Sequence, residues 1–268
     1  MTRTIALTGG ATGIGAATAN RLTTQGCDVH ILDVATPADS NSYRTYIPCN
    51  LASSSSIDNA VSQLPNAIDA LINVAGVAQM PDPADTLAIN FLGMRALSEA
   101  ILPRINRGGS IVIVASSAGW QWRDFEADIS GLLHTSSFAA GRAWLAEHTD
   151  LWRANPYQFS KRCAAAYTYA ATRLALPQGV RVNCVNPGST ETQLSTDFRN
   201  IVSANLYDWG VAQIGRVGKP DDIAEVIEFL AIGNCGWLNG QEIAVDGGYI
   251  GGLIGGWINP SEAPSEPS

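Results

Sequence analysis

Hydrophobic residues form seven short, continuous runs along this chain. They cover residues 5–7, 28–33, 46–51, 68–74, 109–115, 180–185 and 241–245. Their length predicts buried strands. Helices are expected at residues 16–22, 53–64, 83–105, 157–176 and 220–232. Alternating apolar strands and helices are typical of an α/β fold, so we expect a doubly wound parallel sheet of about seven strands with helices on both faces, in one domain over residues 1–250.

Three segments depart from this alternation. Residues 120–156 contain four of the seven tryptophans and a helical apolar pattern, which predicts a helical insertion. We expect that insertion to cover a site or to meet a partner subunit, and ordinary packing as a satellite core is the alternative. Residues 189–217 predict a mobile loop with short helices that serves a site. Residues 251–268 form a tail rich in Gly, Pro and Ser, which we expect to be poorly ordered towards its end.

A glycine-rich turn follows the first strand, with Gly9, Gly13 and Gly15 leading into a helix. Glycine lets the backbone bend tightly and approach a phosphate, and the first N–H groups of a helix attract anions. The turn therefore predicts a dinucleotide site. The spacing is wider than GxGxxG, and a glycine turn without a ligand is the alternative.

Asp33 ends the second predicted strand, about twenty residues beyond the glycine turn. A carboxylate there can accept hydrogen bonds from both ribose hydroxyls of an adenosine and would repel a 2′-phosphate. The nearby positions where an arginine could bind such a phosphate are occupied by Thr12 and Val34. Asp33 therefore favours NAD over NADP, with a solvated charge at a strand end as the alternative.

Composition and charge exclude several classes of function. The net charge of −8 and the lack of a basic cluster argue against nucleic acid. Five scattered cysteines and three histidines show no metal-ligand spacing, so we expect no metal site. The chain begins without an apolar signal segment, and its apolar runs are too short to cross a membrane. A cytoplasmic protein with no membrane partner is expected.

Polar residues in apolar surroundings are the candidates for chemistry. Tyr157 and Lys161 lie one helical turn apart on one face, which could otherwise be a surface pair. Asn90 interrupts an apolar helix, where an amide needs a local partner. Ser116 follows a buried strand, and the carboxyl ends of parallel strands line the ligand crevice.

These motifs occur in one order, namely the turn at residues 8–15, the segment 73–76, Asn90, Ser116, Tyr157-x-x-x-Lys161 and Pro187-Gly188. With them the sequence resembles the short-chain dehydrogenase/reductase family, and the resemblance covers residues 4–248. It implies a Rossmann-type fold and an NAD(P)-dependent oxidoreductase. It further implies that Tyr157 is the acid/base, that Lys161 assists it, that Ser116 binds the substrate oxygen, and that Asn90 supports a proton-relay water.

The same resemblance implies a set of cofactor contacts. They are Gly9, Thr12, Gly13, Ile14 and Gly15 at the pyrophosphate, Asp33 at the ribose, Asn50, Leu51, Asn73, Ala75 and Gly76 on the adenosine side, Tyr157 and Lys161 at the nicotinamide ribose, and Pro187, Gly188, Thr190 and Thr192 around the carboxamide. Asn50 departs from the family pattern, which has aspartate there. An amide can still hydrogen-bond the adenine.

The wide separation of Ser116 and Tyr157, caused by the insertion, resembles the subgroup of 3α-hydroxysteroid dehydrogenase/carbonyl reductases and their coniferyl-alcohol-dehydrogenase-like relatives. There the insertion obstructs one subunit interface, which implies a homodimer and leaves a homotetramer open. We expect a bulky hydrophobic secondary alcohol, steroid-like or aryl, or its ketone, in a pocket walled by Ser117, Trp120 and Trp122. A primary aromatic allylic alcohol and a non-catalytic NAD-binding protein are the alternatives.

Overall fold

Seven strands form one parallel sheet in the computed structural model, which describes residues 2–264 and only the backbone at residues 200–202. They are β1 (Thr4–Thr8), β2 (Asp28–Asp33), β3 (Thr45–Pro48), β4 (Ile68–Asn73), β5 (Ile105–Val114), β6 (Arg181–Pro187) and β7 (Glu242–Val245). Their order across the sheet is β3-β2-β1-β4-β5-β6-β7. The predicted doubly wound sheet is therefore confirmed.

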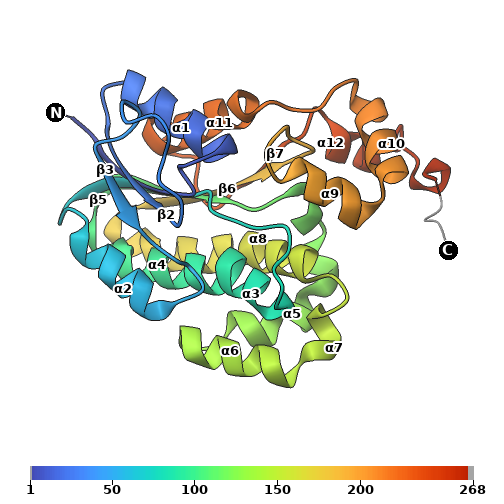
Figure 1. Ribbon diagram of the computed structural model, residues 1–268, viewed down its shortest axis with the longest axis horizontal. Helices are drawn as coiled ribbons and strands as arrows, with labels where there is room; N and C mark the ends of the chain where they lie inside the picture. Colours follow the sequence, from blue (N-terminus) through green and yellow to red (C-terminus); the bar gives the residue numbers. More distant parts are fainter. Residues whose placement is uncertain (1, 265–268) are drawn as a thin grey trace.

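Helices cover both faces of the sheet (Figure 1). One face carries α1 (Gly13–Thr24) and α11 (Pro220–Ile232), and the other carries α2 (Ser54–Gln63), α4 (Met94–Ile101) and α8 (Pro156–Ala175). Leu22 and Ile227 pack with Ile5 in the core on the first face. Burial of such side chains on both faces is the reason that the strands are continuously apolar.

Two predicted elements end earlier than expected. The helix predicted over residues 83–105 is continuous only from Pro83 to Ile101, and within it α3 (Pro83–Leu87) and α4 flank a π-helical turn at Ala88–Gly93. Pro103 lies in a short 3-10 turn, and the chain enters β5 already at Ile105. The third strand ends at Pro48 instead of residue 51, because the Asn50 side chain accepts a hydrogen bond from the backbone N–H of Ala52 and closes a turn.

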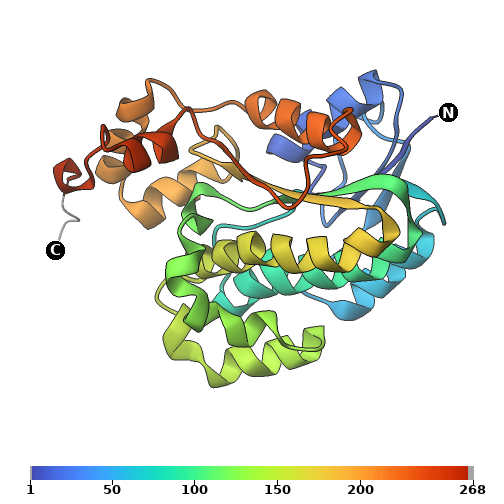
Figure 2. The ribbon, with the colours of Figure 1, turned by 180° about the vertical axis from the view of Figure 1, so that it is seen from behind.

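The insertion forms an extra layer beneath α4 and α8, seen from both sides in Figures 1 and 2. Its helices are α5 (Glu126–Leu133), α6 (Phe138–Glu147) and α7 (Thr149–Trp152). Ile129, Leu145 and Trp152 are fully or almost fully buried and join the core of that face. Core packing therefore accounts for most of this segment's apolar pattern.

A buried arginine fastens the insertion to the fold. Arg95 of α4 is 4% exposed, and its guanidinium donates to oxygens at the end of α5 and just beyond it. The acceptors are the backbone oxygens of Leu132 and Leu133 (3.3 Å each), the hydroxyl of Thr135 (3.0 Å) and the backbone oxygen of Ser137 (3.3 Å). A cation is stabilised there by the carbonyl end of a helix.

The C-terminal third of the chain builds one end of the molecule (Figure 1). The segment 189–217 contains two short helices as predicted, α9 (Ser195–Val202) and α10 (Ala204–Ile214), which we call the lid helices. The expected tail begins differently, because α12 (Tyr249–Gly255) is helical and packs beside α10. Residues 265–268, where disorder was expected, lie outside the described residues. Within residues 2–264, none of the helices has the length and apolar character needed to cross a bilayer.

We expect Arg95→Met to lower the free energy of unfolding by about 2–4 kcal/mol, because four buried or partly buried acceptors lose a charged donor. Urea denaturation followed by circular dichroism measures this loss. Arg142→Met is the matched control, since Arg142 forms a half-exposed ion pair with Asp85 (2.7 Å) that contributes below about 1 kcal/mol. Equal small losses in both variants would contradict the clamping role of Arg95.

Candidate active site

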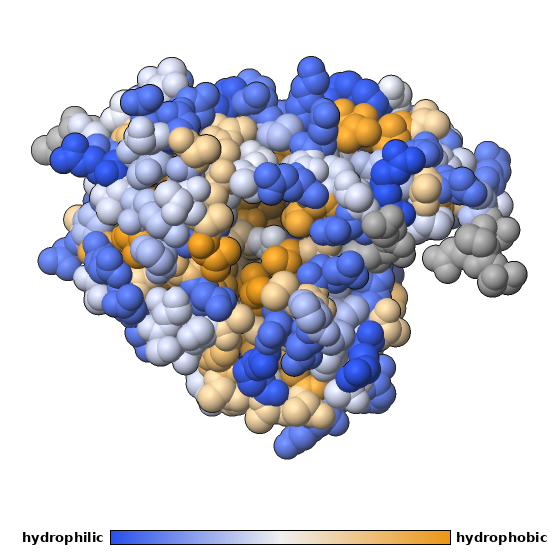
Figure 3. Space-filling view, viewed as in Figure 1, coloured by the Kyte–Doolittle hydropathy of each residue, from blue (hydrophilic) through white to orange (hydrophobic). Residues whose placement is uncertain are grey.

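One large cavity opens where the strands end. Its volume is about 680 Å³, and Figure 3 shows it as a hollow with hydrophobic residues at its walls. The loops after β1, β2, β4, β5 and β6 line it together with the lid helices and α12. This is the position in which open parallel sheets bind ligands.

The glycine-rich turn forms the floor of one end of this cavity. Gly9 has φ +73°, and a Cβ there would lie 2.6 Å from the backbone nitrogen of Ala75. A Cβ at Gly15 would collide with the carbonyl oxygen of Gly9. Only glycine permits this close packing, which exposes the N-terminus of α1 at Gly13 to the cavity. The turn thus fits the pyrophosphate of a dinucleotide.

Asp33 stands at the tip of β2 on the same cavity wall. Its carboxylate accepts hydrogen bonds from the backbone N–H groups of Ala11 and Ala35, each at 3.0 Å. These two bonds orient the side chain and leave further lone pairs on both oxygens. Such an oriented carboxylate suits a ribose diol, with Asn50 and Leu51 lining the cavity nearby.

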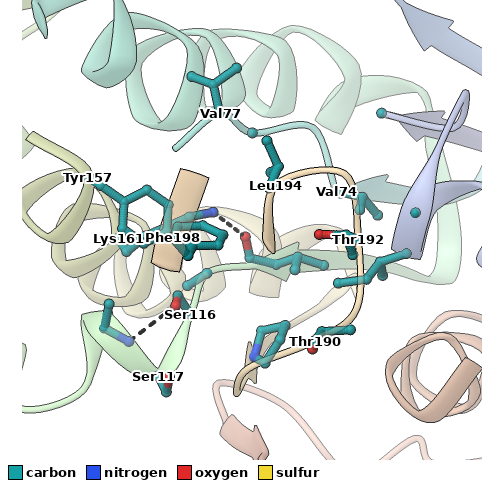
Figure 4. Close-up of a pocket in the computed structure, with 18 of the residues that line it drawn as sticks. Val74, Val77, Ser116, Ser117, Tyr157, Lys161, Thr190, Thr192, Leu194 and Phe198 are labelled. Carbon is teal, nitrogen blue, oxygen red and sulfur yellow. Dashed lines mark hydrogen bonds between the residues drawn. The ribbon is translucent and has the colours of Figure 1, made fainter. Parts of the chain in front are cut away.

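The other end of the cavity holds Ser116, Tyr157 and Lys161 (Figure 4). Ser116 follows β5, whereas α8 supplies Tyr157 and Lys161. The start of α8 is set by Asn155, whose side chain accepts a hydrogen bond from the backbone N–H of Gln158 (3.0 Å). The Ser116 side chain accepts a hydrogen bond from the backbone N–H of Ala118 (3.1 Å), and its hydroxyl lies near the phenol of Tyr157.

Lys161 lies beneath the tyrosine. Its ammonium nitrogen donates to the carbonyl oxygen of Val114 (3.1 Å) and lies 5.7 Å from the centroid of the Tyr157 ring. Burial lowers the pKa of Lys161 to about 8. Burial also raises the pKa of Tyr157 to about 12, and the nearby Ser116 hydroxyl acts in the opposite direction. Burial disfavours the charged form of each of these two groups. A positive charge on Lys161 therefore favours the negatively charged form of Tyr157, and the reverse also holds.

Asn90 lies behind the cavity wall, in the π-helical turn. Its side-chain oxygen accepts from the backbone N–H of Val77 (2.8 Å), and its amide donates to Val77 O (2.9 Å) and to the Ser160 hydroxyl (3.0 Å). A Cβ at Gly76 would lie 3.3 Å from the Asn90 oxygen and 3.4 Å from the Lys161 nitrogen. Gly76 therefore keeps open the space between these two polar groups.

The structure brings most of the predicted site residues together around the cavity. Those that line it are Gly9, Thr12, Gly13, Ile14, Gly15, Asp33, Asn50, Leu51, Ala75, Gly76, Ser116, Ser117, Trp120, Tyr157, Lys161, Pro187, Gly188, Thr190 and Thr192. Asn73 lies behind the wall, where its amide donates to the Ser98 hydroxyl (3.0 Å). The predicted residues thus converge from loops that are far apart in the sequence.

Trp122 is not part of the cavity wall, which corrects its prediction as a substrate-pocket residue. Its indole N–H donates to the carboxylate of Glu242 (2.8 Å), and its ring centroid lies 5.5 Å from that of Tyr169. The first turn of the insertion folds over the edge of the sheet at β7, which carries Trp122 away from Trp120.

Sequence reasoning missed a second set of wall residues. The lid helices supply Phe198, Leu206, Tyr207, Gly210 and Ile214, and α12 supplies Tyr249, Ile250 and Leu253. The sequence predicted that residues 189–217 serve the site, but this signal singled out none of these residues and did not extend to α12. Their convergence on one wall depends on tertiary packing of α10 against α12.

The residues present fit a nicotinamide dinucleotide. The glycine turn and α1 would hold the pyrophosphate, Asp33 the adenosine ribose, and Lys161 the second ribose. The polar groups at the far end can bind an oxygen atom and exchange a proton with it. Within residues 2–264 no cluster of three or more His, Cys, Asp or Glu side chains is placed to hold a metal ion.

Comparisons with known proteins agree with this geometry. The family model described as short chain dehydrogenase matches residues 3–127, and the model described as enoyl-(acyl carrier protein) reductase matches residues 125–250. A coniferyl-alcohol dehydrogenase from a Pseudomonas species is 34% identical and covers 91% of this chain and 95% of its own. A cis-4-hydroxycyclohexanecarboxylate dehydrogenase from Sinomonas cyclohexanicum is 30% identical, with 92% and 96% covered.

Solved structures share the fold. The 3-alpha-hydroxysteroid dehydrogenase of Pseudomonas sp. B-0831, complexed with NADH, has a TM-score of 0.77 and 26% identity, covering 96% of this chain and all of that one. A short chain dehydrogenase from Burkholderia cenocepacia in complex with NADP has a TM-score of 0.68 and 24% identity, covering 93% and 98%. One of these two proteins holds NADH and the other holds NADP. The choice between NAD and NADP in this chain must therefore be argued from its own residues.

Proposed function

Because this chain belongs to the short-chain dehydrogenase/reductase family and is an alcohol-type dehydrogenase, we propose that it uses NAD to interconvert a bulky, uncharged, ring-bearing alcohol and its carbonyl compound. The observation that carries this proposal is the placement of Ser116, Tyr157 and Lys161 at one end of a cavity whose other end fits a dinucleotide. A secondary alcohol of the steroid or aryl type is the leading substrate.

The residues would act as follows in the direction of oxidation. Ser116 binds the substrate oxygen, and Tyr157 takes the hydroxyl proton. The Lys161 ammonium stabilises the phenolate that accepts this proton, because the nearby positive charge favours the anionic form. A bound oxidised nicotinamide would supply the acceptor for the hydride that leaves the carbinol carbon. In the direction of reduction, Tyr157 returns the proton to the carbonyl oxygen.

The wall of the cavity supports an uncharged, ring-bearing substrate. Trp120, Phe198 and Tyr207 present aromatic surface, which suits flat ring systems. Among the described lining residues, Asp33, Lys161 and Asp246 are the only ones that are Asp, Glu, Lys, Arg or His. The carboxylate of Asp246 already accepts from the backbone N–H groups of Gly248 (2.9 Å) and Ile250 (2.8 Å).

A primary aromatic allylic alcohol is the second candidate. It is favoured by the 34% identity with a coniferyl-alcohol dehydrogenase over nearly the whole chain. Such a substrate would place its carbinol carbon at Tyr157 in the same way, with its ring against the aromatic wall. Rates on a steroid alcohol, a benzylic secondary alcohol and a cinnamyl alcohol distinguish the two candidates.

The activity is tested by NADH absorbance at 340 nm with that panel of alcohols. We expect Tyr157→Phe to lower kcat by at least about 10³-fold, because it removes the group that exchanges the proton. Its affinity for NADH, measured by fluorescence, stays within about threefold. The control is Tyr169→Phe, which removes a hydroxyl of α8 that binds Glu242 at the surface. Full turnover by Tyr157→Phe would refute the assigned acid/base.

The pH dependence follows from the raised pKa of Tyr157, about 12. The phenol is protonated near neutrality, so kcat/KM for oxidation rises about tenfold per pH unit from pH 6 to 8, whereas kcat/KM for reduction stays level. Lys161→Met removes the cation, raises the tyrosine pKa further and lowers oxidation across this range. Lys219→Met, at the exposed start of α11, keeps the wild-type profile. A level oxidation profile would contradict this assignment.

Cofactor choice is tested at Asp33. Asp33→Ala removes the carboxylate that repels a 2′-phosphate, so we expect the ratio of kcat/KM for NAD to that for NADP to fall by about tenfold or more. Steady-state kinetics with both cofactors measure the ratio. The control is Asp39→Ala, because Asp39 is an exposed carboxylate that does not line the large cavity. An unchanged ratio in Asp33→Ala would count against the ribose contact.

A further inference from the structure

Phe198 of the lid packs directly on the tyrosine at the reacting end of the cavity. The ring centroids of Phe198 and Tyr157 are 4.8 Å apart, and the rings meet at 63° in an edge-to-face arrangement. Figure 4 shows the phenylalanine ring lying between Tyr157 and the loop that carries Leu194. Both rings line the cavity, so Phe198 forms the part of its wall beside the phenol.

The lid holds Phe198 in this place by contacts at its base and within its helix pair. At the base, Glu191 N–H donates to the carbonyl oxygen of Gly218 (2.8 Å), and Gly218 N–H donates to that of Ser189 (2.8 Å). Within the pair, Arg199 forms an ion pair with Asp208 (2.8 Å). This exposed ion pair joins the two lid helices, and α9 projects the Phe198 ring towards Tyr157.

The position restricts what can be attached to the reacting carbon. A substrate whose oxygen reaches both Ser116 and Tyr157 must place a substituent of its carbinol carbon beside the tyrosine ring. That space is bordered by Phe198. An aromatic ring gains from edge-to-face contact with Phe198, whereas a saturated ring of equal size gains only from burial.

We propose that Phe198 is a specificity-determining residue that favours alcohols with a flat, unsaturated ring next to the carbinol carbon over alcohols with a saturated ring there. This inference rests on the proposed function, and it narrows the substrate to the aryl class. The lid would then help to select the substrate. The residues of α8 and of the loop after β5 would exchange the proton.

The test compares 1-phenylethanol with 1-cyclohexylethanol, which share a carbon skeleton and differ in the ring. We expect the wild-type enzyme to favour the aryl alcohol in kcat/KM. Phe198→Leu keeps an apolar side chain but removes the ring, and we expect it to reduce this preference by about 3- to 10-fold. NADH affinity, measured by fluorescence, shows whether the cofactor end is intact in the variant.

Phe229→Leu is the matched control, because Phe229 is a half-exposed aromatic residue of α11 that does not line the cavity. We expect it to leave both rates and the preference unchanged. Equal preferences in the wild type and Phe198→Leu, or an equal loss in Phe229→Leu, would overturn the inference and leave the proposed function intact. Wild-type protein that oxidises no alcohol of either panel would overturn the proposed function and this inference together.

Discussion

The active end of this molecule depends on burying a phenol and an ammonium group together. Tyr157 and Lys161 lie one turn apart on α8, and burial raises the pKa of the first and lowers that of the second. Near neutrality the phenol is protonated, whereas the amine keeps its positive charge because its pKa of about 8 lies above that pH. In the proposed reaction this nearby charge favours the phenolate that would accept the substrate proton.

The rest of the sheet is arranged so that this pair meets a dinucleotide. The turn after β1 and the tip of β2 prepare one end of the cavity, and the loops after β5 and β6 prepare the other. Asn90 leaves the regular helical pattern to bind the backbone at Val77 and the side chain of Ser160. Its π-helical turn thus couples the loop after β4 to the helix that carries Tyr157, as π-bulges often do at functional sites.

Two additions distinguish this chain from a bare doubly wound sheet. The insertion lies on the face of α4 and α8, where Arg95 fastens it, and it contributes little to the cavity beyond Trp120 and Asn155. The lid helices and α12 instead contribute seven apolar or aromatic residues to the cavity wall, namely Phe198, Leu206, Tyr207, Ile214, Tyr249, Ile250 and Leu253. The tryptophan-rich segment is therefore mainly part of the core, whereas the less conspicuous C-terminal segments surround the substrate end.

Local sequence determined the strands, the glycine turn, Asp33, and the spacing of Tyr157 and Lys161, because each depends on residues within a few positions of one another. A strand is recognised by a short apolar run, and a turn by glycines that no other residue can replace. The order of these motifs along the chain also identified the family and hence the parallel sheet.

Tertiary structure alone decided which aromatic residues reach the cavity. Trp120 and Trp122 are almost adjacent in sequence, yet one lines the cavity and the other binds Glu242 at the edge of the sheet. Phe198 meets Tyr157 only because α9, about forty residues further along the chain, places its ring beside the start of α8. Contacts of this kind join elements whose relative placement depends on the packing of the whole fold, which no local pattern of residues records.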